Sequence, residues 1–72
     1  MSDEAIKRIQ DALKKKLYFD AEKMELTYAL GTLFEKMGKK EEAIEQFKQV
    51  YAIDMGYKDV AKKVDDYYTS LG

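Results

Sequence analysis

The most informative part of this sequence is a pair of stretches, Tyr28-Ala29-Leu30-Gly31-Thr32-Leu33-Phe34 and Ala43-Ile44-Glu45-Gln46-Phe47. Gly31 has no Cβ, so a second helix can approach it closely. Phe34 and Phe47 are large enough to fill the space between two paired helices, and Ala43 is small where the helices would cross. Gly38 lies between the stretches, where a residue in the left-handed conformation can end a helix. The two stretches therefore predict a pair of closely packed helices.

Amphipathic patterning extends this prediction to the whole chain. Apolar residues recur at steps of three and four, which places them on one face of a helix. The expected helices cover residues 3–16, 21–37, 40–54 and 58–70, and no segment has the pattern of a strand. Connections of a few residues make neighbouring helices antiparallel. The fold class is therefore all-α, with four helices in one small domain.

Local residue chemistry predicts where these helices begin and end. Asp20 is a suitable N-cap for the second helix. Breaks are expected at residues 17–20, at Gly38 and at Gly56, where Gly56 would end the third helix in the left-handed conformation. The expected apolar faces extend to several residues near the helix ends: Leu17, Ile53, Ala61, either Tyr67 or Tyr68, and Leu71.

The sequence also contains an internal repeat. Asp3-Glu4-Ala5-Ile6 aligns with Glu41-Glu42-Ala43-Ile44 at an offset of 38 residues, which places Ile9 under Phe47. At the other end, Val64-Asp65 aligns with Leu30-Gly31. A carboxylate in the place of the packing glycine is costly beneath another helix and harmless in water. The last helix is therefore expected to present a polar outer face.

These spacings resemble the signature of the tetratricopeptide-repeat family, whose period is about 34 residues. The matching signature residues are Leu30, Gly31, Phe34, Gly38, Ala43 and Phe47. The resemblance identifies the chain as a C-terminal fragment of such a solenoid. Residues 1–17 would be the second helix of a partial repeat, 24–57 one full repeat and 58–72 a capping helix. Thr27 stands where the family usually has an aromatic residue, and Met55 where proline is common.

The resemblance implies a module that binds a protein or peptide in a groove between residues 21–37 and 58–70. It assigns the following residues to that groove: Glu25, Tyr28, Thr32, Glu35, Lys36, Asp59, Lys62, Asp66 and Thr69. Tyr28 is open to two interpretations, contact with the ligand or packing within the chain. Some family members hold a C-terminal carboxylate with Lys and Asn, but here Tyr28 and Thr32 occupy those places, which argues against such a clamp.

Self-association is the alternative function. The partial first repeat lacks a helix that would cover it, so Ile6, Ile9 and Leu13 are expected to form an apolar edge. An apolar patch of several hundred Å² usually marks an interface. The chain is then expected to be a homo-oligomer.

Composition excludes most other functions. The 72 residues contain no Cys and no His, which removes thiolate and imidazole chemistry and the usual zinc ligands. The net charge of −1 offers no electrostatic footprint for nucleic acid or an anionic membrane. We therefore expect no enzymatic activity, no metal or other cofactor, no nucleic-acid or membrane partner, and a cytoplasmic location.

Overall fold

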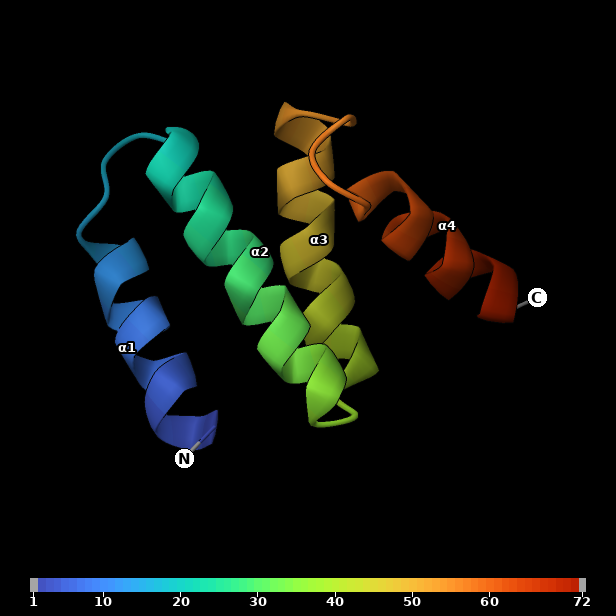
Figure 1. Ribbon diagram of the computed structural model, residues 1–72, viewed down its shortest axis with the longest axis horizontal. Coiled ribbons are helices and arrows are strands. Elements are labelled where there is room, and N and C mark those ends of the chain that lie inside the picture. Colours follow the sequence, from blue (N-terminus) through green and yellow to red (C-terminus); the bar gives the residue numbers. More distant parts are fainter. Residues whose placement is uncertain (1, 72) are drawn as a thin grey trace.

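The computed structural model describes residues 2–71, which form four helices and no strand. These are α1 (Ser2–Lys14), α2 (Ala21–Lys36), α3 (Lys40–Ile53) and α4 (Val60–Leu71). They lie in chain order and alternate in direction, with α1 and α4 at opposite ends of the molecule (Figure 1). The predicted all-α fold with four helices is thereby confirmed, and the breaks fall where the sequence placed them.

Both ends of α2 follow from local residue chemistry. The backbone N–H of Lys23 donates to the Asp20 carboxylate at 2.9 Å, so Asp20 is the N-cap. At the other end Gly38 has a φ of 76°. Its N–H donates to the Glu35 carbonyl at 3.0 Å, and the next N–H donates to the Phe34 carbonyl at 2.9 Å. This pair of bonds is the Schellman arrangement, which requires a residue that tolerates the left-handed region.

The turn between α3 and α4 corrects one expectation. Gly56 does not adopt the left-handed conformation; the positive φ, 44°, belongs to Lys58. The reason is that the Asp54 carboxylate accepts the Gly56 N–H at 2.9 Å and fixes the first part of the turn. The chain reverses two residues later than expected, so α4 begins at Val60.

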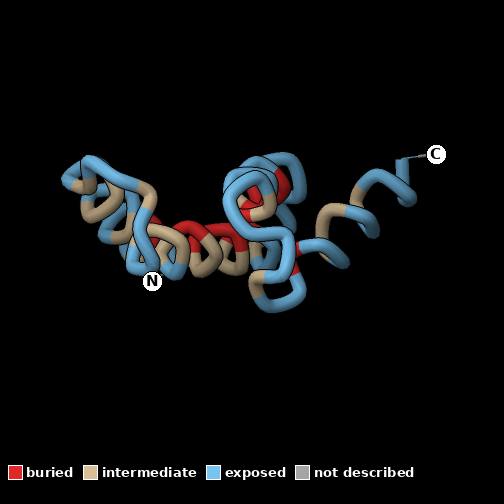
Figure 2. The backbone as a smooth tube through the Cα atoms, turned by 90° about the horizontal axis from the view of Figure 1, so that it is seen from above, coloured by how far each residue is buried: buried red, intermediate tan, exposed pale blue. Residues whose placement is uncertain are grey.

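The core lies between α2 and α3, where Gly31 meets Phe47. A Cβ built on Gly31 would lie 2.8 Å from Cε1 of the Phe47 ring, so only glycine allows this approach. Figure 2 shows the buried backbone concentrated in the middle of the molecule, with mostly exposed end helices. The buried apolar residues are Ile6, Leu30, Phe34, Ala43, Ile44, Phe47, Val50 and Val60.

The apolar edge expected on α1 is wrong as stated. Ile6 is buried, and Ile9 and Leu13 are half-buried against the same core. The physical reason is that α1 turns this stripe toward α2, so these residues hold the two helices together. Leu17 does not extend the stripe, because α1 has ended and the side chain is 88% exposed.

Several expected inward residues near the C-terminal end are also exposed. Tyr67 packs against the core, whereas Tyr68 is 48% exposed and Leu71 65% exposed. Ala61 and Ile53 are exposed as well. The exposure of Tyr68 and Leu71 follows from the path of α4, which diverges from α3 along its length (Figure 1).

Candidate functional site

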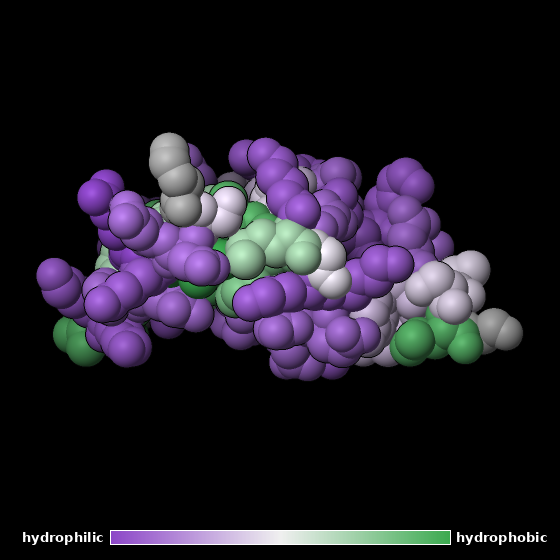
Figure 3. All heavy atoms as spheres, turned by 90° about the horizontal axis from the view of Figure 1, so that it is seen from below, coloured by the Kyte–Doolittle hydropathy of each residue, from purple (hydrophilic) through white to green (hydrophobic). Residues whose placement is uncertain are grey.

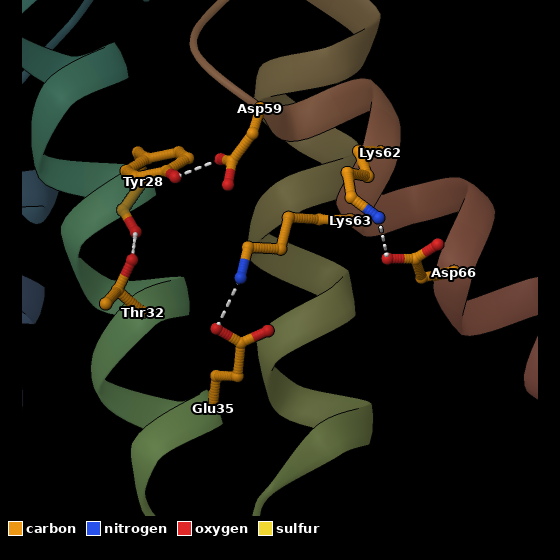
Figure 4. A network of polar contacts seen from close by, with 7 residues as sticks. All are labelled: Tyr28, Thr32, Glu35, Asp59, Lys62, Lys63 and Asp66. Carbon is orange, nitrogen blue, oxygen red and sulfur yellow. Dashed lines mark hydrogen bonds and ion pairs between the residues drawn. The ribbon is translucent and has the colours of Figure 1, made fainter.

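Tyr28 ties α2 to the residues that precede α4. Its hydroxyl donates a hydrogen bond to the Asp59 carboxylate (Figure 4). Its ring centroid lies 5.4 Å from that of Phe47 and 5.7 Å from that of Tyr57, both in tilted or edge arrangements. The Lys58 ammonium lies 5.1 Å from the same ring. Tyr28 therefore packs within the chain, the second of the two interpretations that its sequence position left open.

The hydrogen bond between Tyr28 and Asp59 has a defined protonation state. Burial, followed by the bond to Asp59, raises the pKa of Tyr28 to about 12. The same bond is the main cause of a lowered pKa for the Asp59 carboxyl group. At neutral pH the phenol is thus the donor and the carboxylate is the charged acceptor, which is the stronger kind of hydrogen bond.

A second bridge joins α2 to α4. The Lys63 ammonium lies 2.8 Å from the Glu35 carboxylate, and this hydrogen bond is the main cause of the raised pKa of Lys63. Lys62, which the sequence assigned to the groove, instead pairs with Asp66 of its own helix at 3.0 Å. Lys62 and not Lys63 was predicted from the sequence because adjacent residues point about 100° apart, so an error of one residue in the predicted face selects the wrong lysine. The sequence did offer one signal for this ion pair, since Glu35 in the second helix could pair with either of the two consecutive lysines, Lys62 and Lys63, in the fourth.

The other predicted groove residues take no part in these bridges. The Thr32 hydroxyl donates to the Tyr28 carbonyl at 3.1 Å, which returns it to its own helix (Figure 4). Glu25, Lys36 and Thr69 are exposed. The structure therefore brings together Tyr28 with Asp59, and it joins Glu35 to α4 through Lys63. It does not assemble all nine residues into one continuous surface.

A cavity of about 290 Å³ opens where α4 diverges from α3. Its floor is apolar and its rim is polar, with lining residues from three helices: Glu35, Lys40, Ala43, Ile44, Phe47, Lys63, Asp66, Tyr67 and Ser70. Of the predicted groove residues, only Glu35 and Asp66 belong to it. We call this hollow the α3–α4 cavity.

Two shallower hollows lie elsewhere on the surface. One, of about 350 Å³, is lined by Glu4, Ala5, Arg8 and Ile9 on α1. The other, of about 460 Å³, is lined by residues of α1, α2 and α3 around Thr27. Thr27 is 1% exposed, and its hydroxyl has no hydrogen-bond partner in the described part of the chain. Thr27, which lines this hollow, stands where tetratricopeptide repeats usually have an aromatic residue.

Two further features are absent from residues 2–71. Within residues 2–71, no three acidic side chains are placed to share a metal ion. None of the described helices has the length and apolar content needed to cross a membrane. Comparison of the chain with protein-family models, curated proteins and solved structures found no match. The functional interpretation therefore depends on the surface geometry described above.

Proposed function

We propose that this chain is a helical-repeat module of the tetratricopeptide type that binds a peptide segment of a partner protein. The repeat interpretation is supported by the contact of Gly31 with Phe47 and by the left-handed Gly38 between α2 and α3. It is also supported by the alignments of α1 with α3 and of α4 with α2. Helix pairs of this kind bury their apolar faces by stacking on neighbours, which leaves extended surfaces for a partner.

The α3–α4 cavity is the observation that carries the binding proposal. Its floor consists of Ala43, Ile44 and Phe47, which are already buried and held in place by α2. Its volume suits one apolar side chain of a ligand, since most peptide and small-molecule sites combine an apolar pocket with a few polar groups. The face of the molecule seen from below is largely hydrophilic, with apolar patches near its middle and at both ends (Figure 3). Binding would thus depend on one anchoring side chain rather than on a broad apolar face.

The charges on the rim indicate what should flank that anchor. Lys63 is neutralised by Glu35, and Asp66 by Lys62. Lys40 is exposed on the rim and belongs to none of the ion pairs within residues 2–71. The cation available to a ligand is therefore Lys40. We expect the preferred peptide to carry an apolar residue with a nearby carboxylate.

The test is selection from a displayed peptide library, followed by titration of an enriched synthetic peptide. We expect enrichment of an apolar residue beside an acidic one, and amide chemical-shift changes centred on the cavity residues. Ser70→Trp should fill the cavity mouth and weaken binding at least about tenfold. Thr69→Trp is the matched control, because this exposed neighbour does not line the cavity. Equal effects of the two substitutions would refute the site.

A further inference from the structure

The two end helices each have one face that no other helix covers within residues 2–71. On α1 this face is the hollow formed by Glu4, Ala5, Arg8 and Ile9. It lies beside the stripe that packs on α2, and α1 approaches no helix other than α2. On α4 the uncovered face contains Ala61 and Asp65, which are exposed. Tyr68 lies at its edge, 48% exposed, with the Lys48 ammonium of α3 5.9 Å from its ring centroid.

The α1 hollow occupies a position that is filled on α3. With the offset of 38 residues, Ala5 and Ile9 correspond to Ala43 and Phe47. Both of these α3 residues are buried, and Gly31 of α2 lies against Phe47. The equivalent α1 residues are only half-buried. The hollow on α1 is thus the place where a helix equivalent to α2 would pack.

The uncovered face of α4 is the counterpart of the packing face of α2. With the offset of 34 residues, Ala61, Asp65 and Tyr68 correspond to Thr27, Gly31 and Phe34. All three α2 residues are buried. The free face of α4 therefore corresponds to the face with which α2 packs on its neighbours. A helix face of this kind is what the α1 hollow lacks.

We propose that α4 of one copy packs against the α1 hollow of a second copy, so that the two end helices complete a helix pair between chains. The register follows from the α2–α3 contact. Because Gly31 meets Phe47, Asp65 of one copy would meet Ile9 of the next, with Arg8 beside it.

Charge complementarity makes a second copy the fitting occupant. Arg8 is the only arginine in the chain, and it borders the hollow. A guanidinium group binds a carboxylate with two parallel hydrogen bonds, which a lysine cannot do. Asp65, unsuited to an apolar contact, gains a specific partner in Arg8, while Ala61 and Tyr68 on either side supply apolar contact. Both halves of this arrangement belong to the same sequence.

The geometry also specifies the kind of assembly. The two faces differ and lie at opposite ends of the molecule (Figure 1). A contact between different surfaces is heterologous, so copies add head to tail and the assembly does not stop at a two-fold dimer. None of these residues lines the α3–α4 cavity, so self-association and peptide binding can fail independently.

The experiment measures average mass by sedimentation equilibrium from about 10 μM to about 1 mM, a range suited to weak contacts. The mass of the wild-type chain should rise continuously past that of a dimer. Arg8→Glu and Asp65→Arg should each raise the concentration for half-association at least about tenfold. An equimolar mixture of the two variants should recover wild-type association, because their reversed charges attract one another.

Lys7→Glu and Glu25→Arg are the matched controls, since both reverse an exposed charge at a residue that belongs neither to the α1 hollow nor to α4. Circular dichroism establishes that every variant is folded. Three results would overturn the proposal: a wild-type chain that stays monomeric at about 1 mM, variants no more affected than their controls, or a mixture that does not recover. A mass that stops at twice the monomer would overturn the head-to-tail arrangement.

Discussion

Replacing Gly31 tests the central contact of the fold. A Cβ at this position would lie 2.8 Å from Cε1 of Phe47 and 3.0 Å from both Cδ1 and Cζ. These are not the atoms of a flexible chain end. The Phe47 ring is 2% exposed and is backed by Tyr28 at a centroid distance of 5.4 Å. The ring cannot move away from a new methyl group without disturbing the bridge between α2 and α4.

The expected magnitude combines two opposing effects. In an ordinary helix interior, Gly→Ala stabilises by about 0.5–1 kcal/mol because the unfolded chain loses freedom. Overpacking a buried contact costs about 1–3 kcal/mol. Gly31→Ala should therefore destabilise by about 0–2.5 kcal/mol, and Gly31→Leu by about 3 kcal/mol or more. For a domain of this size, each kcal/mol lowers the melting temperature by about 4–8 °C.

Urea denaturation and thermal melts measure these changes, and the other glycines separate the causes. Gly38→Ala places a side chain at a φ of 76° in open space, so its cost of about 1 kcal/mol comes from the backbone alone. Gly56→Ala meets only the Asp54 carboxylate, at 3.4 Å, and should change stability by less than about 0.5 kcal/mol.

A double-mutant cycle then identifies the crowding partner. Phe47→Leu leaves room beside Gly31, so combining it with Gly31→Ala should cost at least about 0.5 kcal/mol less than the sum of the single changes. The reasoning is refuted if Gly31→Ala stabilises the chain as it would on an exposed helix. It is equally refuted if the two changes are additive.

Three further predictions follow from individual side chains. Thr27→Val should stabilise the chain by about 1 kcal/mol in urea denaturation, because it removes a buried hydroxyl that has no partner; a loss of stability would show that the hydroxyl is hydrogen-bonded. Tyr28→Phe should be less stable than wild type at neutral pH, because it lacks the hydrogen bond to Asp59. This difference in the free energy of unfolding should disappear between pH 10 and about 12, where the phenol of the unfolded wild-type chain ionises before that of the folded chain, whose pKa is about 12. The loss of stability in Tyr28→Phe should also shrink as the pH falls below about 4, because the Asp59 carboxyl group is protonated first in the unfolded chain and only at lower pH in the folded chain, where its pKa is lowered. A loss of stability that is constant across pH would contradict the bond. Lys63→Met should cost less than about 1 kcal/mol, and 1 M salt should reduce the cost, because the pair with Glu35 is partly exposed.

The helix ends show how far sequence reasoning reaches in this chain. Asp20 and Gly38 act through bonds to residues within four positions, so their roles could be predicted from sequence alone. The conformation of the turn after α3 depends on which polar group accepts the backbone N–H groups of the turn. There the Asp54 side chain takes the Gly56 N–H, and the positive φ passes to Lys58. Nothing in the sequence indicated that Lys58 rather than Gly56 would take the positive φ.

The candidate site was harder to predict because it depends on helix rotation. Glu35 and Asp66, which were predicted to lie in a groove between the second and fourth helices, line the α3–α4 cavity, and Lys63 lines it rather than the predicted Lys62. Adjacent residues point about 100° apart around a helix, so an error of one residue in the predicted face of α4 exchanges the two lysines. The cavity itself arises from the divergence of α4, which no local pattern encodes.

Burial along the chain explains why both proposed interactions involve the end helices. The α2–α3 pair contributes six of the eight buried apolar residues, whereas α1 contributes only Ile6 and α4 only Val60. Regions with few buried apolar contacts open at lower free energy than the core. Thr27 adds to this on the α1 side, because a small residue leaves a hollow that is lined by residues of α1, α2 and α3. A partner that covers either end helix would therefore supply contacts that the chain lacks, and its binding should slow amide exchange most in α1 or α4.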